Sequence, residues 1–411
     1  MIRSAFRDAH WMTGSRAIAY RNVLLVMLGL SALLFLGLSR NGIDPMGRPI
    51  GTDFISFWAA AKVAATGHPA AVYDIATHWA AQKAQFPGVD LPYTAFFYPP
   101  VYLLICLPLA LLPYFWSLAV WLFVTGFACL KTLPGRESGL GIATILAFPA
   151  AFINVLHGQN GFLTTALFGG GFMLLQRHPL AAGVCFGCLV YKPHLAILLP
   201  LALVADRRWA VLAAAAATAL ALCAASALVF GLDTWRGFVA GIPVARLTLE
   251  NGLVGDAKMQ SLFAAARMFG AGLPAAYAMQ TALTLLTAAL VVYLGAKRPT
   301  ASAMGALVAA AALLSTPFLL SYDLMLLAVP LVWVFAKARE TGFLAWERLI
   351  LMAGFALPLV SASLSSYLHV PVAPVVVAAV LGAVVRRMGL EQPLAIRRQK
   401  AFGRHRLICD E

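Results

Sequence analysis

The chain has 411 residues, of which 62% are hydrophobic and 11% carry a formal charge. Soluble domains have roughly 45–50% apolar and about 25% charged residues, so this composition excludes an ordinary soluble domain and indicates a polytopic membrane protein. The net charge of +14 does not indicate nucleic-acid binding, because the positive residues lie between apolar runs, as the positive-inside rule predicts.

The apolar runs predict an all-α membrane protein, a single domain over residues 1–411 with about twelve membrane-spanning helices. Crossing the roughly 30 Å hydrocarbon core takes ~17–25 apolar residues. The first run follows four arginines and precedes no small-residue cleavage site, so we expect an uncleaved first span. We predict spans at 20–39, 95–112, 114–130, 139–156, 160–176, 180–204, 209–230, 273–294, 300–317, 319–336, 347–366 and 370–385.

The basic residues between spans set the expected orientation, in which the N-terminus is cytoplasmic. The cytoplasmic segments are then residues 1–19, "DRRW" (206–209), "KRP" (297–299), "KARE" (337–340) and the basic tail 386–411. This orientation fits a plasma membrane protein whose functional face is extracytoplasmic.

In the middle of the chain, the alternation of basic cytoplasmic segments with outer segments is less regular. It places "HGQNG" (157–161) on the cytoplasmic side, and Lys131, Arg136 and Arg177 outside. A short or re-entrant helix in this region would move "HGQNG" to the outer half instead, and the sequence leaves both arrangements open.

Two outer segments, 40–94 and 231–258, are much longer than the roughly 2–8 residues of an ordinary connection. Long loops tend to carry function, and we expect the second to be a lid. The first contains "GTDFISFWAAAKVAATGHPAAVYD", in which Thr52 is a candidate N-cap. An apolar stripe with Trp58 predicts a helix lying in the outer interface of the bilayer, ended by Gly67 and Pro69.

Asp53, at the head of this helix, is the candidate catalytic base. An acid in the first helical turn is favoured by the helix dipole and needs no function. At the membrane surface, however, burial can raise the pKa of a carboxyl group toward that of a general base. Such a base could deprotonate a hydroxyl brought to a lipid-borne donor.

Lys192 lies in "LVYKPHLAILLP", inside an apolar run, where a lysine by default marks a functional site. Pro193 breaks the helix there, and a fixed cation at a helix break is a natural anchor for a phosphate group. Alternatively, Lys192 reaches the membrane interface or pairs with a buried acid. His194 is a secondary substrate-binding candidate.

Asp323 lies in "STPFLLSYDLMLL", beside Tyr322, and no basic residue is near it in sequence. An unpaired acid at the mouth of a helix suits a hydroxyl-rich ligand, so we expect both residues to bind substrate. The alternative is simple exposure to solvent in a loop.

Further polar candidates lie in other segments between spans. His157, Gln159 and Asn160 could hydrogen-bond sugar hydroxyls, or they could simply cap helices. Four outer cations could contact phosphate, although contact with lipid headgroups would serve them equally. We select Arg246 and Arg267 for donor phosphate binding from the set Arg236, Arg246, Lys258 and Arg267. The sequence has no metal-ligand spacing and no Walker-type loop, so we expect no cofactor and no metal; a metal site built from the outer acids is the alternative.

Six stretches together resemble glycosyltransferase family 87, polytopic enzymes of the GT-C type that include polyprenol-phosphate-mannose-dependent α-mannosyltransferases. They occur in the family's order and cover roughly residues 50–335. They read "DFISFWAAAKVAATGHPAAVYD", "FYPPVYLLICLPLALLPY", "HGQNGFLTTAL", "LAAGVCFGCLVYKPHLAILLPLALVADRRW", "SLFAAARMFG" and "STPFLLSYDLMLLAVPL".

The resemblance implies a GT-C-like bundle in which an acid of the first outer loop is the catalytic base, a role that would fall to Asp53. It also implies that Lys192 lies near a lipid phosphate and that 231–258 covers the active site. The expected activity is transfer of a sugar, mannose first, from a polyprenyl-phosphate donor to an extracytoplasmic lipid or glycan acceptor, with inversion.

Two other functions fit parts of the pattern. A transporter or flippase of a lipid or polar solute would explain the spans, Lys192 and the broken helices. A non-catalytic partner in envelope assembly would tolerate loss of Asp53. Neither explains why an acid stands at the head of an interfacial helix.

Overall fold

A computed structural model describes residues 6–133, 141–255 and 258–407. Within them the chain folds into helices, and its β-type pairing is limited to three isolated bridges. The α-helices are α2 (Gly14–Leu38), α3 (Phe54–Ala65), α4 (Ile75–Gln85), α5 (Pro100–Cys106), α6 (Tyr114–Thr132), α7 (Ile142–Leu146), α8 (Pro149–His157), α9 (Gly161–Leu174), α10 (Pro179–Cys188), α11 (Pro193–Ala196), α12 (Leu198–Ala205), α13 (Trp209–Phe230), α14 (Leu232–Glu250), α15 (Leu262–Met268), α16 (Leu273–Gly295), α17 (Ala301–Leu314), α18 (Ala328–Thr341), α19 (Glu347–Leu368) and α20 (Ala373–Leu407). The 3₁₀ helices are η1 (Pro69–Tyr73), η2 (Leu107–Leu111), η3 (Leu189–Tyr191) and η4 (Ser321–Leu327).

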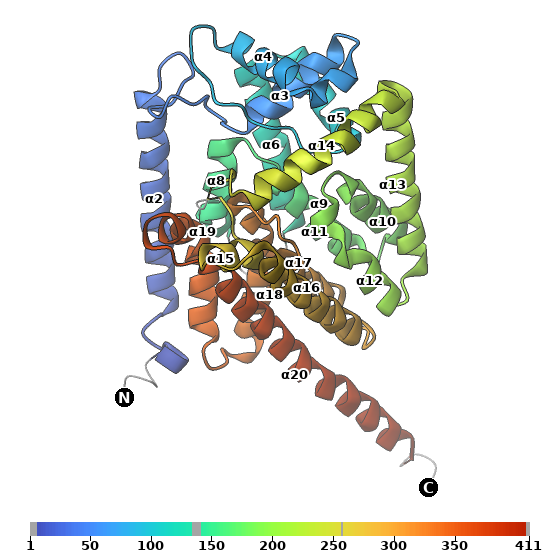
Figure 1. Cartoon of the computed structure of the whole chain (residues 1–411). Coiled ribbons are helices and arrows are strands. Elements are labelled where there is room, and N and C mark those ends of the chain that lie inside the picture. The colour runs from blue at the N-terminus through green and yellow to red at the C-terminus, as the bar shows by residue number, and fades with distance from the viewer. Residues whose placement is uncertain (1–5, 134–140, 256–257, 408–411) are drawn as a thin grey trace.

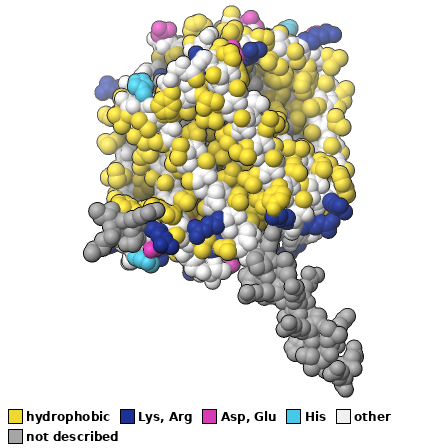
Figure 2. Space-filling model, turned by 60° about the horizontal axis from the view of Figure 1, so that its bottom comes forward, with side chains coloured by type: hydrophobic (Ala, Val, Ile, Leu, Met, Phe, Trp, Pro, Cys, Tyr) yellow, Lys and Arg dark blue, Asp and Glu magenta, His cyan; other side chains and the backbone are white. Residues whose placement is uncertain are grey.

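The composition of these helices confirms an all-α, multi-pass membrane protein. In the described part of the chain, seven helical segments are long and apolar enough to cross a membrane: α2, α6, α13, α16, η4 with α18, α19 and the first half of α20. Shorter apolar helices, such as α9 and α17, complete the bundle. Figure 2 shows hydrophobic side chains over much of the surface turned toward the viewer, as expected where a protein contacts lipid.

The bundle has two distinct ends. Helices α3, α4 and α5 gather at one end, which we call the site end, and both chain termini lie toward the other (Figure 1). That other end, the basic end, carries the loops between α12 and α13, α16 and α17, and α18 and α19. Its cations include Arg207, Arg208, Lys297, Arg298 and Lys337.

The span predicted over 95–112 is wrong. Helices α5 and η2 together cover only twelve residues, about 18 Å at 1.5 Å per residue. Both ends of this segment are also tied to the first outer segment. The carbonyl of Tyr98 accepts a hydrogen bond from Tyr73 (2.8 Å), and that of Leu112 accepts one from the Trp58 indole (3.2 Å).

The span predicted over 180–204 is also wrong, because this segment is a hairpin that returns to the basic end. Gly183, near the start of α10, packs closely on the first turns of α13, and Ala205 at the end of α12 packs on Gly295 at the end of α16. The chain reverses through η3 and the short α11, where Lys192 precedes Pro193.

These two corrections reverse the orientation predicted for the middle of the chain. Helix α6 begins at the site end, where the Tyr114 hydroxyl donates to the Ile50 carbonyl (2.8 Å), so Lys131 lies toward the basic end. "HGQNG" consequently lies at the site end, as the re-entrant alternative expects. Arg177, which precedes α10, is at the basic end, and Arg136 lies outside the described residues. Two of the predicted spans, 95–112 and 180–204, do not cross the membrane. Because removing two crossings leaves the alternation unchanged, the later spans keep their predicted direction.

Helix α3 does not present the single apolar stripe that the sequence predicts. Ten of its twelve residues are buried, and Ala59 and Ala60 have no exposed surface. Helices α4, α5, α6, η1 and η2 all pack against it, so the helix is enclosed by protein. Its end was predicted correctly, since the helix stops at Ala65 and Gly67 follows with φ +87°.

The second outer segment is mostly helical rather than a loop. Helix α14 crosses the site end obliquely (Figure 1), and Gly237 allows it to approach the ring of Tyr73 on η1. The basic tail begins inside α20. Its last residues, 408–411, and its side chains from residue 391 on lie outside the described part of the structure.

Candidate active site

Asp53 lies directly before α3, at its N-cap position. The side chain makes no capping hydrogen bond, and neither does Thr52, so the predicted N-cap is wrong. The hydroxyl of Thr52 instead meets Nδ1 of His157 at 2.6 Å. The carboxylate of Asp53, 9% exposed, is therefore free to interact with side chains from other segments.

The loop between α8 and α9 holds one side of this carboxylate. The Asp53 amide donates to the His157 carbonyl (3.0 Å), and the Gln159 side-chain amide donates to Oδ2 of Asp53 (3.1 Å). Gly158 has φ +62°, and a Cβ there would lie 2.5 Å from Cβ of Phe54. The loop therefore needs glycine in order to approach the head of α3.

Lys258 holds the other side of the carboxylate. Its ammonium lies 2.8 Å from Oδ1 and 3.2 Å from Oδ2 of Asp53, and the lysine side chain is 27% exposed. Its backbone is fixed to the segment before η4, because the Ser321 amide donates to the Lys258 carbonyl (2.8 Å) and Met259 forms a bridge with Leu320. A cation on an anchored backbone thus faces the candidate base from partly accessible space.

A second lysine–aspartate pair lies deeper in the protein. The Lys192 ammonium donates to Asp323 at 2.5 Å and to Oδ1 of Asn160 at 2.9 Å, and both charged side chains are almost fully buried. Oδ2 of Asp323 also accepts from the Leu320 amide (3.2 Å). The interpretation of Asp323 as an unpaired acid at a helix mouth is therefore wrong, and the alternative in which Lys192 pairs with a buried acid is correct.

A continuous series of hydrogen bonds joins the two pairs. The Asn160 amide donates to the side-chain oxygen of Gln159 (3.1 Å), while Gln159 donates to Asp53 and Asn160 accepts from Lys192. The two pairs are thus connected through two adjacent residues of one loop.

The charges around Asp53 decide its protonation. Burial raises the pKa of this carboxyl group, but the charge and hydrogen bond of the Lys258 ammonium and the hydrogen bond from Gln159 together lower the pKa by more. The net pKa lies below its ordinary value, contrary to the expectation that burial would raise it. Burial lowers the pKa of His157, so its imidazole is neutral near pH 7.

Tyr322 lies beside the deeper pair, with its ring centre 4.9 Å from the Lys192 ammonium. Its backbone carbonyl accepts from the side chain of Asn154 (2.9 Å), which ties this segment to α8. The cation and the ring face each other, so Tyr322 belongs to the same cluster as Asn160.

Three other candidate residues have partners elsewhere or are packed differently. Arg246 is exposed and pairs with Glu250 one helical turn away (2.7 Å), and Arg267 donates to the Ala271 carbonyl (2.9 Å). His194 packs edge-on against a phenylalanine, and its Nε2 has no hydrogen-bond partner among the described residues. In the same described part, no three His, Cys, Asp or Glu side chains are grouped in a way that could hold a metal ion.

Comparison with known families identifies the protein class. The model of glycosyltransferase family 87 matches residues 96–321, more than half of the chain. This chain belongs to glycosyltransferase family 87. Family 87 membership makes the protein a membrane glycosyltransferase. The match includes Lys192 and Lys258, whereas Asp53 precedes it and Asp323 follows it by two residues. Comparisons with curated proteins and with solved structures gave no match.

Proposed function

We propose that this family 87 enzyme transfers a sugar, mannose first, from a polyprenyl-phosphate donor to a lipid or glycan acceptor, with Asp53 as general base. The observation that carries the proposal is the buried carboxylate of Asp53, held between the amide of Gln159 and the ammonium of Lys258. A carboxylate next to a partly exposed cation suits a reaction in which a hydroxyl attacks and a phosphate leaves.

The reaction is a single displacement. Asp53 takes the proton of the acceptor hydroxyl while the acceptor oxygen forms a bond to the anomeric carbon. The bond between that carbon and the phosphate oxygen breaks, its electron pair leaves with the polyprenyl phosphate, and the anomeric configuration inverts. Because the leaving phosphate is already a weak base, it needs a cation rather than the general acid of a glycosidase.

Lys258 is the cation we assign to the donor phosphate, in preference to Lys192. The ammonium of Lys192 is shielded from solvent and already pairs with Asp323, whereas Lys258 is partly accessible. When a donor phosphate draws the ammonium away, burial acts on Asp53 without this opposing charge, and its pKa rises. Donor binding would therefore turn an ion-paired carboxylate into a stronger base. Arg246 and Arg267 remain secondary candidates.

The sugar and acceptor hydroxyls would be held by the polar groups around Asp53. The neutral imidazole of His157 and the side chains of Asn160 and Tyr322 are the candidates. His194, packed away from the carboxylate network, is a weaker one. The expected co-substrate is the polyprenyl-phosphate sugar itself, without a further cofactor.

The orientation follows from charge. Positive residues favour the cytoplasmic side, and the basic end carries the loop cations described above, so we place that end in the cytoplasm. The Asp53 end is then extracytoplasmic, on the outer face of a plasma membrane, where lipid-linked donors would present their sugars.

The test is sugar transfer by the purified full chain, offered a panel of labelled polyprenyl-phosphate sugars. Asp53→Asn removes the base and should lower transfer by about 10²–10⁴-fold, the typical contribution of a general base. Asp74→Asn is the matched control, because Asp74 is an exposed N-cap in the same segment and asparagine caps equally well.

Each outcome of this test decides a specific point. Transfer by the wild type that survives Asp53→Asn in folded protein would move the base to another residue. No transfer by folded wild type from any donor would reject the polyprenyl-phosphate assignment and favour the transporter or flippase alternative.

A further inference from the structure

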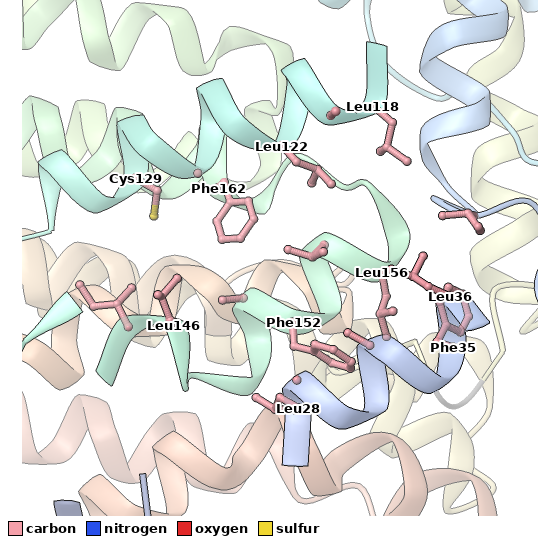
Figure 3. A pocket seen from close by; sticks show the side chains of 18 of the residues that line it. Leu28, Phe35, Leu36, Leu118, Leu122, Cys129, Leu146, Phe152, Leu156 and Phe162 are labelled. Atoms are coloured by element: carbon pink, nitrogen blue, oxygen red, sulfur yellow. The ribbon is translucent and has the colours of Figure 1, made fainter. Parts of the chain in front are cut away.

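The apolar cavity between α2 and the rest of the bundle is not suited to a sugar. It has a volume of about 500 Å³ and lies between α2, α6, α7 and α8. Figure 3 shows side chains of α2, α6 and α8 pointing into it from opposite sides. These side chains are apolar apart from the thiol of Cys129, so they offer no partner for sugar hydroxyls. The sugar of the proposed reaction needs a different wall, closer to the two lysine–aspartate pairs.

A series of aromatic rings packs between α3, the segment before α5, α5 itself and η3. The ring centres of Tyr98 and Tyr102 lie 4.4 Å apart, and Tyr102 stacks on Tyr191 at 5.1 Å. Phe57 meets Tyr98 edge to face at 5.5 Å. The other three rings have at most 1% exposed surface, whereas Tyr98 is partly exposed. Tyr98 is therefore the accessible end of an otherwise closed series.

Tyr98 lies beside the polar groups of the site. Phe57, against which its ring packs, comes one helical turn after Asp53. The hydroxyl of Tyr98 interacts with the side chains of Asn160 and Tyr322, two of the candidates for binding sugar hydroxyls. An accessible aromatic ring is thus close both to the candidate base and to the side chains that would hold the sugar.

The backbone of Tyr98 fixes the position of this ring. Pro99 follows it and restricts the preceding residue to extended conformations. The Tyr98 carbonyl also accepts the hydrogen bond from the Tyr73 hydroxyl (2.8 Å), and the Tyr73 ring packs against Phe238 of α14 at 5.9 Å. Because the ring stands on an anchored backbone, little ordering is needed when a ligand binds against it.

We propose that the ring of Tyr98 is the wall against which the transferred sugar packs, and that its π face stabilises the positive charge of the transition state. This inference rests on the proposed function. As the bond from the anomeric carbon to the phosphate breaks, positive charge develops on the sugar, as in the oxocarbenium-like transition state of glycoside hydrolysis. The face of an aromatic ring carries negative potential and attracts a nearby cation. Tyr98 forms no bond in this step and transfers no proton.

The first measurement is the kcat of sugar transfer as the ring at position 98 is varied. Tyr98→Phe keeps the π face and removes the hydroxyl. Replacing Tyr98 by phenylalanines that carry one, three or five fluorine atoms keeps the shape of the ring and weakens its π face step by step. We expect kcat to fall at each step, to about tenfold below Tyr98→Phe in the pentafluoro variant, equivalent to about 1.4 kcal/mol. The donor KM should change less, because the charge exists only in the transition state.

Tyr93 provides the matched control. It is a partly exposed tyrosine of the same segment, but its ring packs against His78 of α4 at 5.7 Å. The same fluorinated series at position 93 should leave kcat at the value of Tyr93→Phe. If the wild type transfers sugar and kcat is constant across the series at position 98, the charge stabilisation is overturned while the proposed function stands. Equal falls of kcat at both positions would also overturn it, because they would report a general effect of fluorination.

The second measurement does not depend on turnover. Tyr98→p-azidophenylalanine, irradiated with the panel of polyprenyl-phosphate sugars labelled in the sugar, should crosslink to the sugar of at least one donor, whereas Tyr93→p-azidophenylalanine should not. A crosslink at position 98 without transfer by the wild type would retain the sugar wall and reject the proposed reaction. No crosslink from any donor would reject the sugar wall, whether or not the wild type transfers sugar.

Discussion

The two lysine–aspartate pairs of the site use the same residue types in opposite surroundings. The side chains of Lys192 and Asp323 are 3% and 0% exposed, and each makes a further hydrogen bond. Those of Lys258 and Asp53 are 27% and 9% exposed. We call Lys192 and Asp323 the closed pair, because it has no room to exchange partners. Lys258 and Asp53 form the open pair, whose cation solvent and substrate can reach. The comparison separates a pair that positions residues from a pair that can take part in the reaction.

The closed pair should show the largest effect when it is broken. Asp323→Asn or Lys192→Met leaves one buried charge without its partner, which typically costs about 3–5 kcal/mol of stability. We expect a correspondingly large fall in the free energy of unfolding, measured by denaturation of the detergent-solubilised protein.

The double variant Lys192→Met with Asp323→Leu is the control for this prediction. Replacing a whole buried ion pair by apolar residues is often neutral or stabilising, so the double variant should recover much of the lost stability. Single variants that unfold like the wild type would show that the pair is not what holds this part of the site.

The open pair should respond in binding more than in stability. Lys258→Met should raise the donor KM about 10–100-fold, since a hydrogen bond to a charged group contributes about 1.5–3 kcal/mol. The free energy of unfolding should fall by less than in the single variants of the closed pair, because Lys258 is partly exposed and Gln159 still donates to the Asp53 carboxylate. Lys258→Arg keeps the charge and should recover part of the affinity. An unchanged donor KM in Lys258→Met would remove this residue from phosphate binding.

The acid side of the pH profile of kcat/KM should also depend on the open pair. The pKa of Asp53 in the folded protein is lowered, so its charge contributes stability above the unfolded pKa and this contribution is lost as pH falls through the folded pKa. In Lys258→Met the burial effect is no longer opposed by the ammonium, so the pKa of Asp53 should rise. We expect the acid limb of kcat/KM to move to higher pH in this variant. A limb that stays in place would mean that another group titrates there.

Gln159 links the two pairs and should show the smallest effect. Gln159→Leu removes one hydrogen bond to the charged carboxylate of Asp53, worth about 1.5 kcal/mol at the lower end of the range for charged groups, so kcat/KM should fall roughly tenfold. Asn160 would remain in contact with Lys192, and stability should stay near that of the wild type. A loss as large as that of Asp53→Asn would show that the linking loop, rather than the carboxylate alone, sets the geometry of the base.

The sequence predicted the membrane class and most of the long helices, whereas the role of Asp53 stays a prediction. It failed where short apolar segments turn back, because length and hydropathy do not distinguish the α10–α12 hairpin from a span. The Lys192–Asp323 pair could not be predicted, since its residues are 131 positions apart and nothing local reports their contact.

Among the outer cations, the sequence alone favours Arg246 and Arg267 over Lys258 for phosphate binding. A local feature of the sequence favours Lys258 instead. Arg246 has Glu250 one helical turn away and Arg236 has Asp233, so each has a nearby acid to pair with. Lys258 and Arg267 have no acid three or four positions away, so they were the cations available to distant partners.

The distance along the chain between the partners of the closed pair has a consequence for biosynthesis. At about 5–20 residues per second, a ribosome needs roughly 7–26 s to proceed from Lys192 to Asp323. During that interval the tip of the α10–α12 hairpin carries an ammonium without its carboxylate partner, so the buried pair cannot form before the later segment is made. A truncated chain that ends before Asp323 lacks this pair, which distinguishes it chemically from the finished enzyme.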